Sequence, residues 1–162
     1  MGSGAGPDLS RPGHVNALDT NILVYAHRED SEWHETAYAA VARLAEGGAP
    51  WAIPAPCLHE FLAIVTHPRI YQPATPLELA LDQVAAWLES PSLVIISESE
   101  GYWDQLHALL LSSRVTGGKV HDARIAALCL HHRVTELWSA DRDFTRFVGL
   151  RVRNPLVDPG TP

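Results

Sequence analysis

A short apolar run that ends on a carboxylate limits the fold of this chain more than any other feature. Val15-Asn16-Ala17-Leu18 is followed at once by Asp19-Thr20-Asn21, and further apolar residues come next. This profile predicts a buried strand that passes directly into a helix, with Asn21 or Thr20 as the cap. Ligands of open α/β sheets bind beyond the carboxyl ends of the strands, so Asp19 is a candidate site residue. Taken alone, an aspartate here is more commonly a helix cap than a ligand.

Strand and helix patterns alternate along the rest of the chain. Strands are predicted at 15–18, 49–54, 93–96, 136–139 and 150–153, and helices from about 21, at 31–45, 57–66, 77–88, 102–111 and 121–132, with a helical turn at 141–147. In the helix 77–88, spacing predicts an apolar side made of Leu77, Leu81, Val84, Ala85 and Leu88. The alternation predicts an α/β fold whose parallel sheet is covered by helices on both faces.

The length and composition fit one folded domain. The chain has 162 residues and is 46% hydrophobic, which is enough for a sizeable core. We expect this domain over 15–157, after a Gly-, Pro- and Ser-rich leader or tag over 1–14. No apolar run approaches the roughly 20 residues that span a bilayer, so no membrane association and a cytoplasmic location are expected. Cys57 and Cys129 lie in apolar helical patterns, which predicts buried free thiols.

The net charge of −7 argues against nucleic-acid binding by bulk electrostatics. Most of the basic side chains, however, lie in the last third of the chain. Bound divalent cations could offset the acidic charge and bridge to phosphate. Candidate contacts to an RNA backbone are then Arg114, Lys119, Arg124, Arg142 and Arg146. Taken singly, an arginine of this set is more commonly a solvated surface charge.

Three further carboxylates occupy positions comparable to that of Asp19. Glu60 lies in an apolar helix after the second strand, and Asp122 opens a late helix. Asp141 follows a strand as Asp19 follows the first, and Asp143 is predicted to be a first-turn helix acid favoured by the helix dipole. Glu60 could instead face solvent, and Asp122 could be a cap.

Four carboxylates in one crevice need a cation, because like charges within a few ångströms raise one another's pKa values. Mg²⁺ or Mn²⁺ prefers oxygen ligands and is commonly held by one or two carboxylates together with substrate phosphates. Such a site supports metal-dependent hydrolysis of phosphodiesters.

An ordered set of segments carries a family resemblance. The set is Asp19-Thr20-Asn21, Glu60, Val120-His121-Asp122-Ala123 and Ser139-Ala140-Asp141-Arg142-Asp143-Phe144, with Thr66-His67-Pro68-Arg69 and Asn154-Pro155-Leu156 beside it. Together these segments resemble the PIN-domain ribonucleases, and most closely the VapC toxins of bacterial type II toxin–antitoxin modules. The resemblance extends from about 15 to 155.

The resemblance implies a three-layer α/β/α sandwich with a central parallel sheet. It implies metal ligation by Asp19 and Asp122, completed by Glu60 and Asp141, while Thr20 and Ser139 match hydroxyl positions that orient ligands or water. It also implies cleavage of a structured RNA such as tRNA, inhibition by a cognate VapB-type antitoxin, and a homodimer. Ser139 departs from the more usual threonine.

Functions other than that of a ribonuclease are also weighed against the sequence. A phospho-receiver domain needs an aspartate after its third strand, where this chain has Ile96-Ser97-Glu98. A zinc protein is suggested by nine histidines, but their spacing matches no known zinc pattern. A catalytically silent PIN-fold binding module and a DNA-directed PIN-type nuclease stay open as alternatives.

Overall fold

The computed structural model describes residues 13–157. In chain order the elements are β1 (Asn16–Leu18), α1 (Thr20–His27), α2 (His34–Glu46), β2 (Trp51–Pro54), α3 (Ala55–Val65), α4 (Leu77–Leu88), β3 (Leu93–Ile96), α5 (Tyr102–Ser113), α6 (Lys119–His131), β4 (Glu136–Trp138), a 3₁₀ helix (Arg142–Arg146) and β5 (Val152–Arg153). The leader expected over 1–14 lies outside the described residues except for its last two, so the domain boundary stays a prediction.

The five strands form one parallel sheet in the order β3-β2-β1-β4-β5. The chain runs outward from central β1 through β2 to β3, and then returns to the other side of β1 with β4. The direction of winding therefore reverses between β1 and β4. In open α/β sheets a crevice forms at the carboxyl ends of the strands at this reversal, which is where ligands bind.

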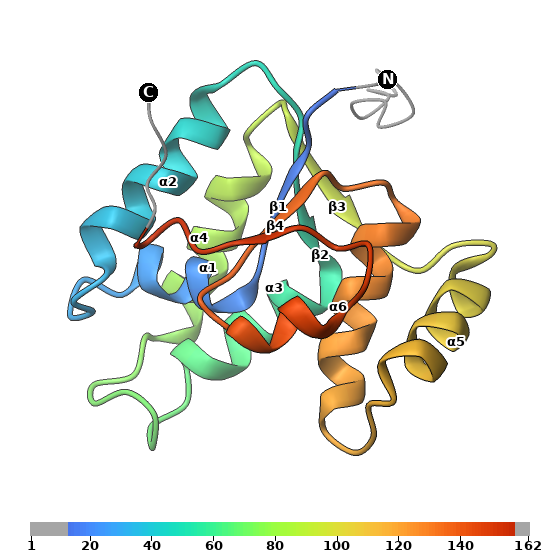
Figure 1. The fold of residues 1–162 in the computed structure, drawn as a ribbon. Helices are drawn as coiled ribbons and strands as arrows, with labels where there is room; N and C mark the ends of the chain where they lie inside the picture. The colour runs from blue at the N-terminus through green and yellow to red at the C-terminus, as the bar shows by residue number, and fades with distance from the viewer. Residues whose placement is uncertain (1–12, 158–162) are drawn as a thin grey trace.

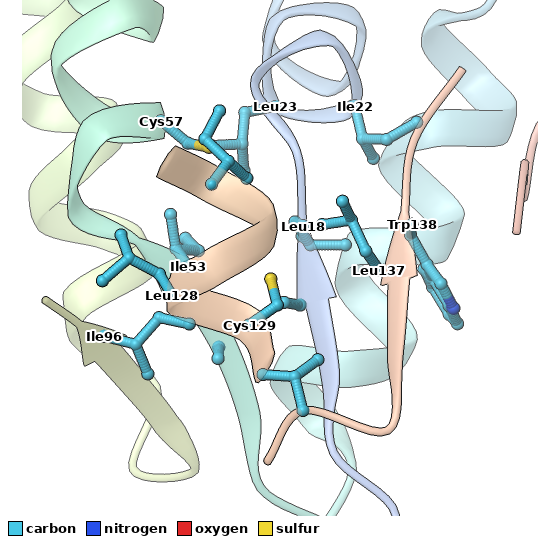
Figure 2. Packing of buried hydrophobic residues seen from close by; sticks show 14 of the residues in the cluster. Leu18, Ile22, Leu23, Ile53, Cys57, Ile96, Leu128, Cys129, Leu137 and Trp138 are labelled. Carbon is cyan, nitrogen blue, oxygen red and sulfur yellow. The ribbon is translucent and has the colours of Figure 1, made fainter. Parts of the chain in front are cut away.

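Helices cover both faces of the sheet, as Figure 1 shows, with α2 and α4 on one side and α5 and α6 on the other. This confirms the expected three-layer α/β/α sandwich. Small side chains let α6 pack closely, since Ala123 and Ala126 are fully buried. In Figure 2 Leu128 and Cys129 of α6 lie beside Leu18 and Ile53 of the sheet. Within residues 13–157, no helix has the length and apolar character needed to cross a membrane.

The prediction that Asn21 or Thr20 caps the first helix is wrong. Asp19 is the N-cap residue, with extended backbone angles, and its Oδ1 accepts a hydrogen bond from the Thr20 N–H at 2.8 Å. The helix can begin one residue earlier because the carboxylate satisfies a backbone donor that the first turn leaves without a partner. Asn21 is thus free to make contacts elsewhere.

The bounds predicted for α4 are correct, but its predicted apolar side is buried only in part, since Val84 packs against the core and the leucines of α4 do not. Ala80 and Trp87 are buried, whereas Leu77, Leu81 and Leu88 are each about half exposed. The Trp87 ring packs edge-to-face on Phe61 of α3, with centroids 4.8 Å apart. This aromatic contact fixes the orientation of the helix and turns its leucines outward.

Candidate active site

The ends of β1 and β4 lie side by side and bring Asp19 next to Ser139. Leu18 is in register with Trp138 in the parallel pair, so the next residues of both strands are neighbours. The Asp19 N–H donates to the Trp138 carbonyl at 3.0 Å, and the Ser139 hydroxyl donates to Asp19 Oδ2 at 2.6 Å. The acid predicted at the end of β1 therefore lies at the reversal point of the sheet.

Four donors fix the Asp19 carboxylate. Its Oδ1 accepts from the Thr20 N–H and from the Cys57 thiol, whose Sγ is 3.8 Å away. Its Oδ2 accepts from Ser139 and from the Asn21 amide at 3.2 Å. Burial raises the pKa of the Cys57 thiol, and the charge of Asp19 adds to that effect, so this thiol stays a neutral donor.

Asn21 joins α1 to the segment that follows β4. Its Nδ2 also donates to Ser139 Oγ at 3.2 Å, and its Oδ1 accepts from the Ala140 N–H at 3.1 Å. Ser139 Oγ in turn accepts from the Asp141 N–H at 3.0 Å. Asp141 caps the 3₁₀ helix, because its Oδ1 accepts from the Asp143 N–H at 2.8 Å. Residues far apart in sequence thus form one hydrogen-bonded unit.

The four predicted acids line a single pocket of about 300 Å³. Asp19 and Asp141 come from the strand ends, Glu60 from α3 and Asp122 from the first turn of α6. Glu60 does not simply face solvent, since its Oε2 accepts from the Thr20 hydroxyl at 2.6 Å. We call this space the acidic pocket.

The electrostatics of the acidic pocket disfavour the ionised form of Asp19. The pKa of Asp19 is raised from 3.8 to about 6, mainly by burial, with the nearby charges of Glu60 and Asp122 adding to the rise and the hydrogen bonds from Ser139 and Thr20 opposing it. The side chain is only 5% exposed. A buried carboxylate repelled by two others is a group that a bound cation would stabilise.

Lys119 lies against the acids instead of standing free for a phosphate. Its Nζ donates to Asp122 at 3.3 Å and also contacts Asp143. The hydrogen bond from Lys119 lowers the pKa of Asp143 and raises that of Lys119. Asp143, predicted as a supporting site residue, is not among the residues that line the acidic pocket.

The other candidate cations lie outside the acidic pocket. Arg124 donates from Nε to Glu98 at 2.9 Å and lines a different hollow, beside α5. Arg142 and Arg146 are exposed on the 3₁₀ helix, and Arg114 is exposed at the end of α5. None of these arginines lines the acidic pocket.

Sequence reasoning missed the apolar and aromatic walls of the acidic pocket. Tyr25 and Ile64 each follow a predicted site residue by four positions, Asn21 and Glu60 respectively, so helical spacing could have indicated both. Tyr71 comes from the loop after α3, and no sequence signal places it. Cys57 was predicted to be a buried thiol, which is confirmed, but its contact with Asp19 was not predicted.

The donor set fits Mg²⁺ or Mn²⁺. The acidic pocket presents carboxylate and hydroxyl oxygens, the ligands that these hard cations prefer. In the described part of the chain, no three His, Cys, Asp or Glu side chains lie close enough together to hold a metal ion by themselves. Magnesium sites commonly use only one or two carboxylates, with waters and substrate phosphates as the remaining ligands.

Comparison with known proteins places this geometry in a family. The PIN domain family model matches residues 17–150. Ribonuclease VapC43 of Mycobacterium tuberculosis is 35% identical over 139 residues, which cover 86% of this chain and 94% of that protein. Ribonuclease VapC48 of the same organism is 30% identical over 139 residues, covering 86% and 96%.

Two solved structures share the fold. A structure of VapBC2 from Rickettsia felis bound to a DNA fragment from their promoter matches with a TM-score of 0.64 at 22% identity, covering 86% of this chain and 98% of that chain. A structure of VapC20 from Mycobacterium tuberculosis, described as a sarcin-ricin loop cleaving toxin, matches with a TM-score of 0.60 at 15% identity, covering 84% and 98%. With the family match and the identity to the two ribonucleases, this chain belongs to the PIN-domain family, among its VapC ribonucleases.

Proposed function

We propose that this chain is a metal-dependent endoribonuclease toxin that cleaves a structured RNA such as tRNA in the acidic pocket. One observation carries the proposal. Asp19 is buried at the reversal point of the sheet, is held by four donors, and has its pKa raised to about 6 in a pocket that three other carboxylates also line. Asp19 caps α1, but capping alone does not account for this environment, because a cap needs no neighbouring carboxylates.

The residues of the acidic pocket have distinct roles in this proposal. Asp19 and Asp122 would hold Mg²⁺ or Mn²⁺, and Glu60 and Asp141 would complete the ligand set. When bound, the metal would supply Lewis-acid activation of water for phosphodiester hydrolysis. Thr20 holds Glu60 through its hydroxyl, and Ser139 and Asn21 hold Asp19 in one orientation.

The shape and charge of the chain favour a looped RNA substrate over a duplex. The acidic pocket is a hollow of about 300 Å³ walled partly by aromatic side chains, which suits an unstacked nucleotide. A net charge of −7 opposes extended contact with phosphates, so recognition would depend on the local shape of an RNA loop. The solved VapC20 neighbour is described as cleaving such a loop.

We further propose a VapB-type antitoxin partner, a homodimer and action in the cytoplasm. The Rickettsia felis neighbour was solved as a VapBC assembly, which supports an antitoxin for this chain. Exposed apolar side chains support a protein partner or a second copy, since monomers rarely leave such patches uncovered. On α4, Leu77, Leu81 and Leu88 are each about half exposed and lie on one side of the helix.

A cleavage screen tests the proposed function. Purified protein is incubated with total small RNA and, separately, with single-stranded DNA, in Mg²⁺, in Mn²⁺ and in EDTA. Discrete RNA fragments that disappear with EDTA and with Asp19→Asn or Asp122→Asn would support the proposal. Cleavage of DNA alone would favour the DNA-directed alternative, and metal binding without cleavage of either would favour the silent binding module.

A further inference from the structure

A second hollow, the α5–α6 hollow, lies beside the acidic pocket and has no role in the function proposed above. Its volume is about 480 Å³, within the usual range for small-ligand sites. Its walls come from α5, from the start of α6 and from the loop after β3. Figure 1 shows α5 lying alongside α6 at the edge of the molecule.

A buried hydroxyl in the α5–α6 hollow has no hydrogen-bond partner. The Tyr102 side chain is 6% exposed, and its Oη is one of two buried side-chain polar atoms left unsatisfied within residues 13–157. Burial raises the pKa of this hydroxyl and the charge of Glu98 adds to that effect, while the charge of Arg124 opposes it. A buried hydroxyl is costly unless it is hydrogen-bonded, so a ligand that reached this atom would supply the missing bond.

A flat aromatic surface also lines the α5–α6 hollow. Trp103 lines the same hollow and is 68% exposed, which is unusual for an indole. Arg124 and Glu98 form an ion pair on the rim, and together they offer guanidinium donors and carboxylate acceptors. An indole face with donors and acceptors nearby is suited to a planar heterocycle that has a polar edge.

The first turns of α6 connect the hollow to the acidic pocket. His121 lines the hollow and the next residue, Asp122, lines the acidic pocket. Further along the helix, Arg124 lines the hollow and Ile125 lines the acidic pocket. A chain that crosses this end of α6 would therefore meet both sites.

We propose that the α5–α6 hollow binds a nucleobase of single-stranded RNA that flanks the segment in the acidic pocket. Trp103 stacks on the base, and the Tyr102 hydroxyl bonds its polar edge. The substrate class rests on the proposed function, but the binding site rests on the geometry of α5 and α6. Stacking on an exposed aromatic tolerates any base, so this site adds affinity and has little sequence preference.

Binding of fluorescein-labelled single-stranded oligoribonucleotides, measured by anisotropy in EDTA, tests the proposal. One probe has a mixed sequence, and a second has the same length with abasic positions. Trp103→Ala is compared with Leu111→Ala, a residue on the same helix with the same 68% exposure that does not line the hollow. Molecular mass is measured for each protein by sedimentation.

We expect Trp103→Ala to raise the dissociation constant of the mixed-sequence probe about tenfold and Tyr102→Phe to raise it a few-fold. Leu111→Ala should change nothing, and the abasic probe should bind all four proteins alike. Equal binding of the mixed-sequence probe to wild type and Trp103→Ala would overturn the proposal. If Trp103→Ala lowers the molecular mass because an oligomer dissociates, and this accounts for its weaker binding, the proposal would also be overturned. The hollow would then be an interface between copies of the chain.

The same variants separate this proposal from the proposed function. RNA cleavage that is unaffected by Trp103→Ala would refute the base site and leave the ribonuclease intact. Trp103-dependent binding without cleavage under any metal would support the base site and refute the ribonuclease. Absence of any RNA binding by the wild type would refute the base site.

Discussion

The Ser139 hydroxyl donates to Asp19 Oδ2 at 2.6 Å across 120 residues of sequence. This bond joins the ends of the two strands between which the sheet reverses its winding. Ser139 also accepts from Asn21 and from the Asp141 N–H, so one hydroxyl connects two of the four acids. The positions of Asp19 and Asp141 in the acidic pocket therefore depend on Ser139.

Ser139→Ala should weaken both metal binding and the fold. Without the hydroxyl, Asp19 loses a bond that lowers its pKa, and the bonds from Asn21 and Asp141 lose their acceptor. We expect metal affinity to fall about tenfold and the free energy of unfolding to fall by about 1–3 kcal/mol. Calorimetric titration with Mn²⁺ and chemical denaturation measure the two effects.

Ser139→Thr is the matched control for that substitution. It keeps the hydroxyl and adds one methyl group at a position that is 2% exposed. We expect metal affinity within a few-fold of the wild type. A Ser139→Ala variant with wild-type metal affinity would show that the bond to Asp19 does not organise the site.

Asp19 should make the metal-free protein less stable as pH rises. The pKa of Asp19 is about 6 in the fold and 3.8 without it, so the folded state binds the proton more tightly. The stability this provides is fully present below pH 3.8 and is lost as pH rises through about 6, in total about 3 kcal/mol. Between pH 5 and pH 8, the free energy of unfolding of the wild type should fall by about 1 kcal/mol more than that of Asp19→Asn.

Urea denaturation of both metal-free proteins at the two pH values measures this difference. Asp19→Asn is the reference because it cannot titrate, so the other groups that titrate in this range cancel. Parallel pH dependences for the two proteins would contradict the assignment of a raised pKa to Asp19.

Lys119→Met should change metal and RNA binding in opposite directions. Lys119 neutralises part of the charge of Asp122 and Asp143. Removing it leaves the acidic pocket more negative, so affinity for Mn²⁺ should rise a few-fold while affinity for RNA falls. Arg124→Met is the control for the metal measurement, because Arg124 pairs with Glu98 outside the acidic pocket. A fall in Mn²⁺ affinity in Lys119→Met would contradict this account.

Ala126→Leu should destabilise the fold without touching a site residue. Ala126 is fully buried where α6 packs into the core, so added volume forces neighbouring groups apart. We expect a loss of about 1–3 kcal/mol. Ala108→Leu on the exposed side of α5 is the control and should be nearly neutral. Equal unfolding midpoints of the two variants would show that α6 is loosely packed.

Local signals predicted the elements and the two strand-end acids, whereas the family resemblance was needed to add Glu60 and Asp122 to the site. Strand ends marked Asp19 and Asp141, and alternation of strands and helices predicted the parallel sheet. The outward side of α4 could not be predicted, because the contact of Trp87 with Phe61 decides it across the fold. The same holds for Lys119, whose pairing with Asp143 spans 24 residues and appears only once α6 and the 3₁₀ helix are placed.

Polar partners were the least predictable part of the site. Asparagine is a residue type typical of helix caps, but the side-chain amide of Asn21 forms hydrogen bonds with Ser139 and Ala140, far along the chain. Cysteine in an apolar helical pattern is typical of the core, but the thiol of Cys57 also contacts Asp19. Such contacts depend on which strand ends become neighbours, and hydrophobic periodicity carries no information about them.

The rate of cleavage of one RNA in Mn²⁺ tests the central claim most directly. A target found in the small-RNA screen is incubated with wild type, Asp19→Asn and Asp104→Asn, an exposed acid on α5 that serves as the control. We predict cleavage at one position by wild type and Asp104→Asn, and a rate at least about 100-fold lower for Asp19→Asn and in EDTA. Cleavage by Asp19→Asn at the wild-type rate, or cleavage that persists in EDTA, would contradict a metal-dependent ribonuclease centred on Asp19.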